Sequence, residues 1–326
     1  MKNVIEVGII GTGNIATTVH MPLLSCMEGV SIKYAADIQE PNFRYPPDIR
    51  KIRIRDDLSV LPDCDIVLLA VPVGARRRYI EEFARRNIMI FTEKPFAPDT
   101  ESHIKFLEVA NRINCNYMRT TYSSIRQLKE ICGSGMLGEL KEVNITEGGI
   151  VKKTTKGKEH YQTKAGLSGG GILMESGCHT LSQLSFLFNE GNITVHQAAA
   201  VYQNELDVDI SANMIVRQKR NKINIRYQLS FIKPLQTLST YTFEKAKVQF
   251  NHVDAQSQLQ IIPQNTGRQR FTLNNDKKWA ATFYQAFYLK WKKILNDLKQ
   301  QNHVNTEEGT SLQTTKIITD IYSITR

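Results

Sequence analysis

The start of the chain contains the pattern that most restricts its fold. The apolar run Val4–Ile10 leads into the turn Gly11-Thr12-Gly13-Asn14-Ile15-Ala16, which has the spacing G-x-G-x-x-A, and the helix-like stretch Ala16–Met27 follows. In such a unit the first glycine allows a tight turn, the second lets the backbone approach a pyrophosphate, and the small third residue permits close helix–strand packing. The pattern predicts a parallel α/β sheet whose first helix offers backbone N–H groups to an anion.

Short apolar runs and helix-like segments continue to alternate up to about residue 120. Nearly continuous apolar strands with helices between them indicate a parallel sheet that is covered on both faces. The expected strands are Val4–Ile10, Val30–Ala36, Ile66–Val71 and Ile88–Thr92, and the expected helices are Ala16–Met27, Arg77–Arg86 and Asp99–Arg112. We therefore expect residues 1–120 to form a doubly wound Rossmann domain that binds a dinucleotide.

Beyond residue 120 the pattern changes, because strand-like runs follow one another without helices between them. Such an order indicates an antiparallel sheet. After a helix-like stretch at Ser124–Cys132, the runs are Val143–Val151, Thr194–Tyr202, Val208–Arg217 and Lys222–Phe231, with a hairpin turn at Lys219–Asn221 and more strands to about Phe271. Helices are expected at Trp279–Lys299 and, after Asn305 or Thr306 as N-cap, at Glu307–Ile324. Residues 121–326 should form an α+β domain with a large, mainly antiparallel sheet flanked by helices.

The end of the second expected strand carries an acidic residue, Asp37. In dinucleotide-binding folds an acid at this place accepts hydrogen bonds from the ribose hydroxyls of the adenosine. The next residues, Ile38 and Gln39, are not arginines, which favours NAD over NADP. Arg44 is close enough in sequence to keep NADP open.

The chain is basic, with 42 Lys and Arg against 32 Asp and Glu and a net charge of +10. This excess fits a nucleic-acid or anionic-surface binder, an enzyme whose ligands carry phosphates, or a basic surface without a single partner. The densest basic runs are Arg76–Arg78, Lys152–Lys158 and Arg217–Lys222, far apart in the sequence, and no nucleic-acid-binding motif accompanies them. We expect no nucleic-acid partner and assign part of the charge to phosphate-bearing ligands.

No apolar stretch approaches the about 18 residues that a membrane-spanning helix needs, and the N-terminus has no signal-peptide pattern. The five cysteines are irregularly spaced and include no C-x-x-C pair, so neither a disulfide framework nor a zinc site is indicated. The expectation is a soluble cytoplasmic protein with no metal and no membrane partner.

Two further motifs point to a family. Thr92-Glu93-Lys94-Pro95 ends the fourth expected strand, and the second half contains Gly169-Gly170-Gly171-Ile172-Leu173-Met174-Glu175-Ser176-Gly177-Cys178-His179. Together with the N-terminal turn, they resemble the E-K-P and G-G-G-x-x-x-D-x-G-x-H motifs of the glucose–fructose oxidoreductase/inositol dehydrogenase/rhizopine catabolism (Gfo/Idh/MocA) family. The resemblance extends over essentially the whole chain.

The resemblance implies an NAD(P)-dependent oxidoreductase that interconverts a secondary alcohol and a ketone on a sugar, sugar nucleotide or cyclitol. His179 would be the general base and Lys94 would hydrogen-bond the reacting oxygen, the two residues coming from opposite sides of a cleft. The aspartate that the family has at the position of Glu175 orients substrate and partner groups. The predicted cofactor-binding residues are Gly11, Thr12, Gly13, Asn14, Ile15, Asp37, Val71, Pro72, Arg76, Glu93 and Lys94.

Helix geometry supports the second motif independently. On an α-helix, Glu175 and His179 are about 40° apart and leave the same face. The opposite arc is apolar and suited to core packing; it consists of Leu173, Leu181, Leu184, Leu187 and Phe188.

Three departures from the family pattern leave an alternative open. Glu175 is one methylene longer than the usual aspartate, and Arg76 stands where many members have histidine, either contacting an anionic cofactor or substrate or lying on the surface. The segment Ile38–Leu61 contains three prolines and looks shortened and poorly helical. This segment would alter the adenine side of the pocket. Substitutions such as Glu175 and Arg76 are what a non-catalytic sensor or regulatory protein of the same fold would show.

Other candidates are weaker. Tyr122 and Tyr161 lie where related sequences have substrate-facing residues, but a core or surface position is equally compatible with each. His160 is expected to be solvated and His20 to be a packing residue. The resemblance also implies a homodimer or homotetramer that uses one face of the antiparallel sheet.

Overall fold

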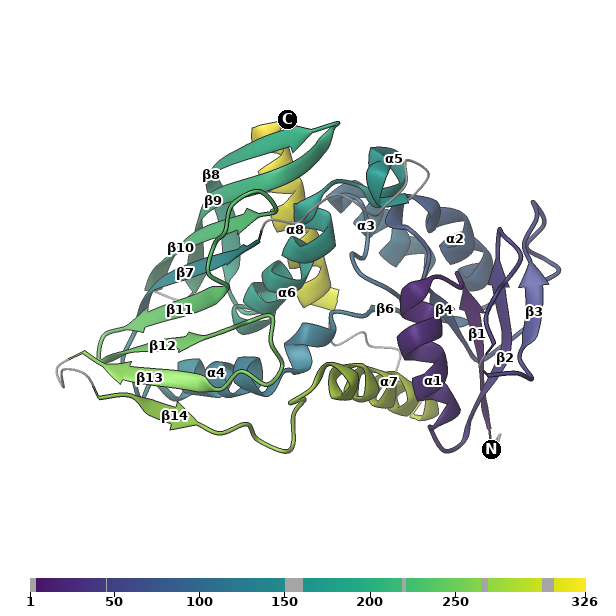
Figure 1. Cartoon of the computed structure of the whole chain (residues 1–326), viewed down its shortest axis with the longest axis horizontal. Coiled ribbons are helices and arrows are strands. Elements are labelled where there is room, and N and C mark those ends of the chain that lie inside the picture. The colour runs from purple at the N-terminus through teal and green to yellow at the C-terminus, as the bar shows by residue number, and fades with distance from the viewer. Residues whose placement is uncertain (1–3, 45, 150–160, 219–220, 265–268, 301–307) are drawn as a thin grey trace. The chain divides into compact units, whose positions relative to one another are not determined.

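The computed structural model of the chain describes residues 4–44, 46–149, 161–218, 221–264, 269–300 and 308–326. It consists of two compact units (Figure 1). The first comprises Met1–Asn116 and Phe287–Glu308, and the second Tyr117–Ala286 and Gly309–Arg326. The hairpin turn predicted at Lys219–Asn221, the N-caps predicted at Asn305 or Thr306, and His160 lie wholly or mainly outside the described residues.

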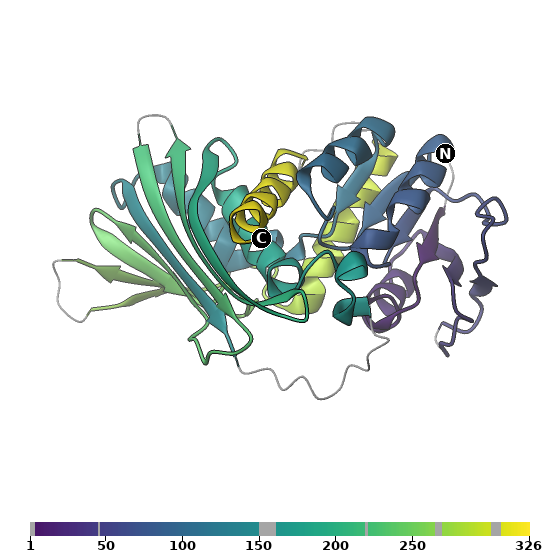
Figure 2. The same cartoon turned by 90° about the horizontal axis from the view of Figure 1, so that it is seen from above.

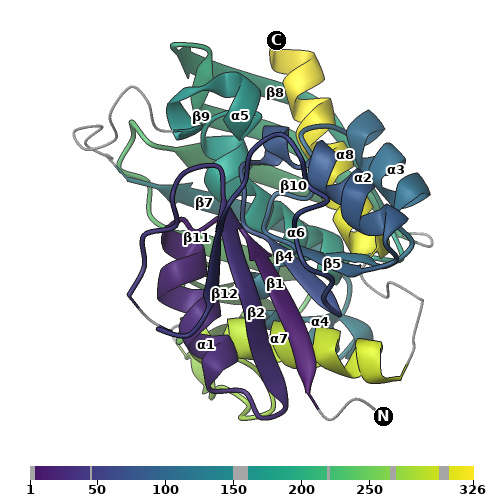
Figure 3. The ribbon, with the colours of Figure 1, turned by 90° about the vertical axis from the view of Figure 1, so that its right-hand side faces the viewer.

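The sheet of the first unit is parallel throughout, with the order β3-β2-β1-β4-β5-β6. Figure 3 shows its central strands, around which the order reverses. The strands are β1 Ile5–Ile10, β2 Val30–Asp37, β3 Arg50–Arg53, β4 Ile66–Leu69, β5 Met89–Thr92 and β6 Ile113–Cys115. This is the predicted doubly wound Rossmann sheet, extended by two short strands, β3 and β6, that we did not expect.

The helices of the first unit are shorter than predicted. The segment after the glycine turn is a π-helix, η1 Ala16–His20, followed by α1 Met21–Ser25. Beyond it come η2 Val73–Ala75, α2 Arg77–Arg85 and α3 Thr100–Val109. Among the described residues between β2 and β4 there is no helix, as the prolines of that segment predicted.

The boundary predicted near residue 120 lies close to Asn116, but the chain also crosses back into the first unit. Most of α7 Phe283–Lys299 belongs to this unit, and Figures 1 and 3 show it beside α1. Its apolar residues Trp291, Ile294 and Leu295 pack in one core with Ile9 and Phe91 of the sheet. A simple division at residue 120 therefore misassigns α7.

The second unit contains an eight-stranded sheet with the order β14-β13-β12-β11-β7-β10-β9-β8. Neighbouring strands are antiparallel except for β7 and β10, as the prediction of a mainly antiparallel sheet requires. The strands are β7 Leu140–Gly148, β8 Asn192–Gln203, β9 Leu206–Gln218, β10 Asn221–Ser230, β11 Leu238–Phe243, β12 Ala246–Phe250, β13 Leu259–Pro263 and β14 Phe271–Leu273.

The described helices of the second unit lie on one face of this sheet (Figures 1 and 2). They are η3 Met118–Thr121, α4 Ser123–Ser134, η4 Tyr161–Thr163, α5 Ala165–Ser168, η5 Leu173–Gly177, α6 Cys178–Leu187 and α8 Glu308–Thr325. Strand β10 shows the consequence, because Ile223, Ile225 and Tyr227 are buried while Asn224 and Arg226 are exposed. In the described part of the chain, no helix is both long and apolar enough to cross a membrane.

Candidate active site

The glycine turn after β1 has the geometry that its motif predicts. Gly11 adopts φ +93°, and a Cβ there would lie 2.5 Å from the carbonyl oxygen of Ala70 at the end of β4, so only glycine fits. Ala16 is fully buried, as close helix–strand packing requires. A Cβ on Gly13, by contrast, would meet no atom within 4 Å, so the turn leaves open space there.

Asp37 at the end of β2 is bonded to this turn. Its Oδ2 accepts hydrogen bonds from the backbone nitrogen of Thr12 at 2.6 Å and from Thr12 Oγ1 at 3.0 Å. Its Oδ1 accepts from the Gln39 amide at 3.2 Å. Asp37 therefore stabilises the turn through these hydrogen bonds. The carboxylate is half-buried and retains lone pairs that can accept hydrogen bonds from ribose hydroxyls.

Four predicted residues lie at one edge of the sheet. Gly11 follows β1, Asp37 ends β2, Val71 follows β4, and Lys94 follows β5. Strands β2, β1, β4 and β5 are consecutive neighbours, and the strand order reverses between β1 and β4. Ligands of open parallel sheets bind outside the carboxyl ends of the strands at such a reversal, which is where these residues gather.

Arg76 lies inside the protein and not on its surface. Its side chain is only 2% exposed, so the surface alternative is wrong and little of it is left to contact a cofactor. Its Nε donates to the carbonyl of Val71 at 3.1 Å, its Nη2 to that of Lys94 at 3.3 Å, and its Nη1 to that of Pro95. The guanidinium thus ties the end of β4 to the segment that carries Lys94.

The carboxylate of Glu93 is also directed into the protein. Its Oε1 accepts hydrogen bonds from Asn116 Nδ2 at 2.6 Å and from His20 Nε2 at 2.9 Å, and its Oε2 from the Lys94 amide at 3.2 Å. Burial alone raises the pKa of this carboxyl, but interactions with His20, the hydrogen bond from Asn116 and the Lys94 cation outweigh it and hold the pKa below its ordinary value. The geometry therefore supports an indirect role for Glu93 rather than the cofactor contact that we predicted.

Lys94 is half-buried, and its peptide bond to Pro95 is cis. Its backbone is fixed on both sides, since the amide donates to Glu93 and the carbonyl accepts from Arg76. The sequence contains no local sign of this arrangement, because Arg76, Glu93 and His20 come from three separate segments.

In the second unit, the glycine run Gly169–Gly171 lies against β9. Asp207 of that strand accepts hydrogen bonds from the backbone nitrogens of Gly171 at 2.6 Å and Leu173 at 2.8 Å, and from the Tyr322 hydroxyl at 2.7 Å. A Cβ on Gly171 would lie 2.0 Å from the Asp207 carbonyl oxygen. The backbone of β9 therefore occupies the space that a side chain at Gly171 would need.

Glu175 and His179 follow this run, but not on a regular α-helix. Residues Leu173–Gly177 form a π-helix, in which the Cys178 amide donates to the Leu173 carbonyl, and α6 begins at Cys178. The rotation of 100° per residue that we assumed therefore does not hold between the two side chains; π-turns of this kind are frequent at functional sites. Both residues are half-buried, while the predicted apolar arc is buried.

The partly buried carboxylate of Glu147 lies next to the start of α6. Glu147 Oε2 accepts a hydrogen bond from Thr180 Oγ1 at 3.0 Å and lies 3.2 Å from His252 Nε2. Burial raises the pKa of Glu147, but His252, Arg119 and Thr180 together hold it below its ordinary value. We did not predict Glu147 or His252, since neither belongs to a motif.

The two tyrosines differ from each other. Tyr122 is 2% exposed and immediately precedes α4, which favours its core alternative. Tyr161 is exposed in the short helix η4, so a surface position is the alternative that the structure supports. Within the described residues, no group of three or more His, Cys, Asp or Glu side chains could hold a metal ion.

Family models decide the relationship of this chain to known proteins. Residues 5–121 match an oxidoreductase family with an NAD-binding Rossmann fold, and residues 125–234 match the GFO/IDH/MocA C-terminal domain. The chain belongs to the Gfo/Idh/MocA family. The resemblance inferred from the three motifs is thereby confirmed.

Two curated relatives in this family are dehydrogenases. The chain is 25% identical over 155 residues to inositol 2-dehydrogenase from Rhizobium meliloti, which is 46% of this chain and 44% of that protein. It is 25% identical over 147 residues to D-xylose 1-dehydrogenase [NADP(+)] from Haloarcula marismortui, 43% of this chain and 40% of that protein. The chain thus matches less than half the length of each curated relative.

Solved structures of Gfo/Idh/MocA-like proteins share the fold over the whole chain. A 3-ketoreductase variant from Actinomadura kijaniata, in complex with TDP-benzene and NADP, has a TM-score of 0.82 at 17% identity and covers 99% of this chain and 98% of its own. An aldose–aldose oxidoreductase from Caulobacter crescentus has a TM-score of 0.79 at 16% identity and covers 98% and 97%.

The residues present fit the NAD(P) cofactor that the family binds. The turn leaves open space at Gly13, and Asp37 stands at the adjacent strand end. Arg53 on β3 is in register with Asp37 on β2, so both side chains leave the same face of the parallel sheet. Sequence reasoning considered only Arg44 as a basic neighbour, because β3 has one apolar residue and no strand pattern.

Proposed function

We propose that this chain is an NAD(P)-dependent oxidoreductase that interconverts a secondary alcohol and a ketone on a sugar, sugar nucleotide or cyclitol. The observation that carries the proposal is the gathering of Gly11, Asp37, Val71 and Lys94 at the carboxyl ends of four adjacent parallel strands. The nicotinamide ring, when bound, accepts or gives the hydride. Family membership and the names of the relatives support the same reaction class.

The residues of the chain would bind, orient and move a proton. The N–H groups at the start of η1 and the open turn at Gly13 suit the pyrophosphate, and Asp37 suits the ribose. Lys94 would hydrogen-bond the reacting oxygen and stabilise negative charge on it. His179 would accept the hydroxyl proton, and return it in the ketone-reduction direction. Glu175 would orient His179 or the substrate.

The substrate class rests on the relatives and on charge. The two curated relatives act on inositol and xylose, and a solved relative holds a TDP ligand. The net charge of +10 favours a substrate that carries phosphate, which suits a nucleotide-linked sugar.

The test has a binding stage and a turnover stage. Thermal shift with NAD, NADH, NADP and NADPH should show stabilisation by at least one of them. Reduced-nicotinamide absorbance is then followed with inositol, xylose and TDP-sugars. His179→Ala should lower kcat by about 10²–10⁴-fold, and Lys94→Met by about 10²–10³-fold.

Two matched variants control for general damage. His196→Ala removes an exposed histidine on β8, and Lys105→Met removes an exposed lysine on α3. Both should retain the wild-type rate. Full activity in His179→Ala would rule out its role as base. Cofactor binding without turnover on any substrate would support the sensor alternative, which Glu175 in place of aspartate also favours.

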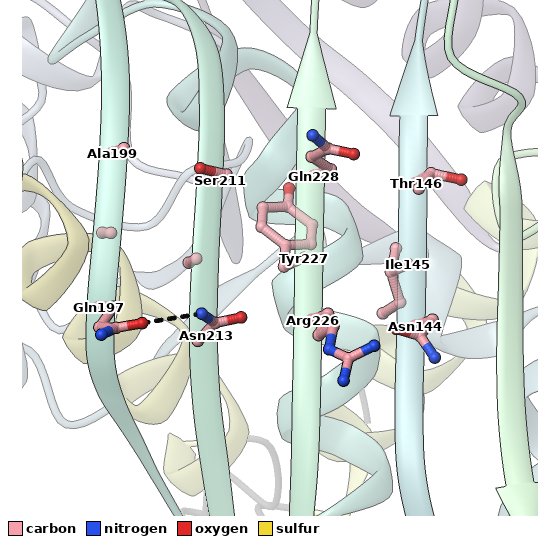
Figure 4. Close-up of a pocket in the computed structure, with 12 residues that line it drawn as sticks. Asn144, Ile145, Thr146, Gln197, Ala199, Ser211, Asn213, Arg226, Tyr227 and Gln228 are labelled. Atoms are coloured by element: carbon pink, nitrogen blue, oxygen red, sulfur yellow. Dashed lines mark hydrogen bonds between the residues drawn. The ribbon is translucent and has the colours of Figure 1, made fainter.

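We propose further that the chain forms a homodimer or homotetramer through the sheet face that the described helices leave uncovered. This face has a shallow groove of about 470 Å³ between β7, β8, β9 and β10 (Figure 4). Polar side chains line it, among them Asn144, Gln197, Asn213, Arg226 and Gln228. Light scattering should give the mass of two or four chains, and Asn213→Arg should lower it; a wild-type monomer contradicts the proposal.

A further inference from the structure

His20 occupies a closed position in the first unit, between two polar partners. The residue is fully buried, and its Nε2 lies 2.9 Å from Oε1 of Glu93. On the other side of the ring, the indole nitrogen of Trp291 donates to Nδ1 of His20 at 2.9 Å. The rings of Phe91, Phe287 and Trp291 stand edge-on to the imidazole. A packing role, which the sequence suggested, does not account for these two hydrogen bonds.

The chemistry of the partners determines the protonation of His20. An indole N–H can only donate a hydrogen bond, so the Nδ1 atom that faces Trp291 must be the acceptor and carry no proton. The proton of the neutral ring is then on Nε2, where it points at Glu93. A second proton on Nδ1 would face the indole N–H and break this bond. Trp291 therefore holds His20 as the neutral Nε2–H tautomer.

A neutral His20 leaves the charge of Glu93 uncompensated on that side. The carboxylate accepts from His20 and Asn116 on Oε1 and from the Lys94 amide on Oε2. Buried carboxylates need a nearby cation or several donors to stay ionised. Interactions with His20, then with Asn116 and the charge of Lys94, lower the pKa of Glu93; with His20 neutral, Lys94 is the cation that remains among these partners.

The other elements packed on His20 contribute aromatic rings to its surroundings. Strand β5 contributes Phe91, and α7 contributes Phe287 and Trp291. The buried Lys290 precedes Trp291 by one residue and so leaves α7 about 100° away from it. Among the described side chains within hydrogen-bond distance of the His20 ring, Glu93 is the titratable one.

We propose that His20 is a positioning residue for the reaction: Trp291 holds it as the neutral Nε2–H tautomer, and in this form it keeps Glu93 an oriented anion beside Lys94. The chain Trp291–His20–Glu93–Lys94 links α7, at the far end of the sequence, to the lysine proposed to meet the reacting oxygen. The positioning role of His20 rests on the proposed function, whereas the assignment of its tautomer does not.

The tautomer is tested directly by ¹⁵N NMR of the full-length protein with labelled histidine, assigned with His20→Gln. At neutral pH, wild-type His20 should show a protonated Nε2 and an unprotonated Nδ1. Trp291→Phe keeps an aromatic ring but removes the donor, so the preference for the Nε2–H tautomer should weaken in this variant. A protonated Nδ1 in the wild type at neutral pH would overturn the proposal.

The functional arm compares variants of His20 by NADH affinity, measured from nicotinamide fluorescence. His20→Phe retains a ring but donates no hydrogen bond, and should raise the dissociation constant about tenfold, the value of one charge-assisted bond. His20→Gln places an amide N–H near Nε2 and should restore most of the affinity. Equal affinity in His20→Phe and wild type would overturn the positioning role. If the wild type binds no NADH, the proposed function fails, and the NMR measurement still decides the tautomer.

Discussion

The carboxylate of Asp207 lies 2.6 Å from the backbone nitrogen of Gly171, and the Asp207 carbonyl oxygen would be 2.0 Å from a Cβ at that position. Asp207 therefore accepts a hydrogen bond from Gly171, and its backbone leaves no room for a side chain at that position. Because this run leads directly into the helix of Glu175 and His179, Asp207 determines where that helix begins.

Substitution of Gly171 should show this constraint. We expect Gly171→Ala to lower the free energy of unfolding by about 1–3 kcal/mol, because the methyl group collides with backbone that cannot rotate away. Gly309→Ala is the control, since a Cβ there meets nothing and alanine favours the helix by about 0.5–1 kcal/mol. Urea unfolding measures both. An equal effect of the two substitutions would contradict the close packing at Gly171.

Arg76 should behave as a structural residue. Arg76→Met leaves the carbonyls of Val71, Lys94 and Pro95 without this donor, and we expect a loss of about 2–4 kcal/mol of unfolding free energy. NADH affinity should fall as well, because the Lys94 segment loses its support. Arg77→Met is the neighbouring control, whose exposed pair with Glu81 should leave the stability close to that of the wild type. Wild-type stability of Arg76→Met would refute this role.

Cofactor preference should depend on Asp37 and Arg53. Asp37→Ala should weaken NADH binding more than NADPH binding, because the ribose hydroxyls lose their acceptor while the repulsion of a 2′-phosphate disappears. Arg53→Ala should weaken NADPH binding by about tenfold with little change for NADH. Arg50→Ala, at the other end of the same strand, controls for the loss of charge. Calorimetric titration of each variant with both cofactors gives the ratios. Equal effects of Arg50→Ala and Arg53→Ala would leave only a general electrostatic role.

Acid should destabilise the protein through Glu93 and Glu147. The pKa of each carboxyl in the folded chain is below the ordinary value of 4.5, so the unfolded chain binds protons more readily. Their contribution to stability is complete above about pH 4.5 and is lost as the pH falls through the folded pKa. Urea unfolding between about pH 3.5 and 6 should therefore show a smaller pH dependence in Glu147→Gln. The exposed control Glu101→Gln should follow the wild type; a wild-type slope in Glu147→Gln would contradict the assignment.

Much of the fold was predictable, because it depends on local patterns. The four strands that carry apolar runs were found within a few residues, whereas β3 and β6 were missed. The residues of β3 are Arg50-Lys51-Ile52-Arg53, mostly exposed at the edge of the sheet, so they have no apolar run. The assignment of α7 failed for a different reason. Its aromatic residues indicated burial, but not the unit against which they pack.

The candidate site likewise contains features that the sequence predicts and features that it does not. Gly11 and Asp37 could be placed from spacing alone, because a positive φ and a strand end are local features. The partners of Arg76 could not, because a backbone carbonyl has no sequence signature. The angle between Glu175 and His179 also escaped prediction, since nothing in the sequence announces the π-turn.

The sequence by itself determined the family, the order of the two units, and the residue types that are expected to meet the cofactor. It could do so because glycine spacing, strand alternation and helical periodicity are properties of neighbouring residues. Only the tertiary structure showed that Arg76, His20 and Glu93 are buried and hydrogen-bond to other segments of the chain. Buried polar groups must find partners, and these partners come from segments as distant in sequence as Glu93 and Trp291. Their roles therefore became visible only once the chain was folded.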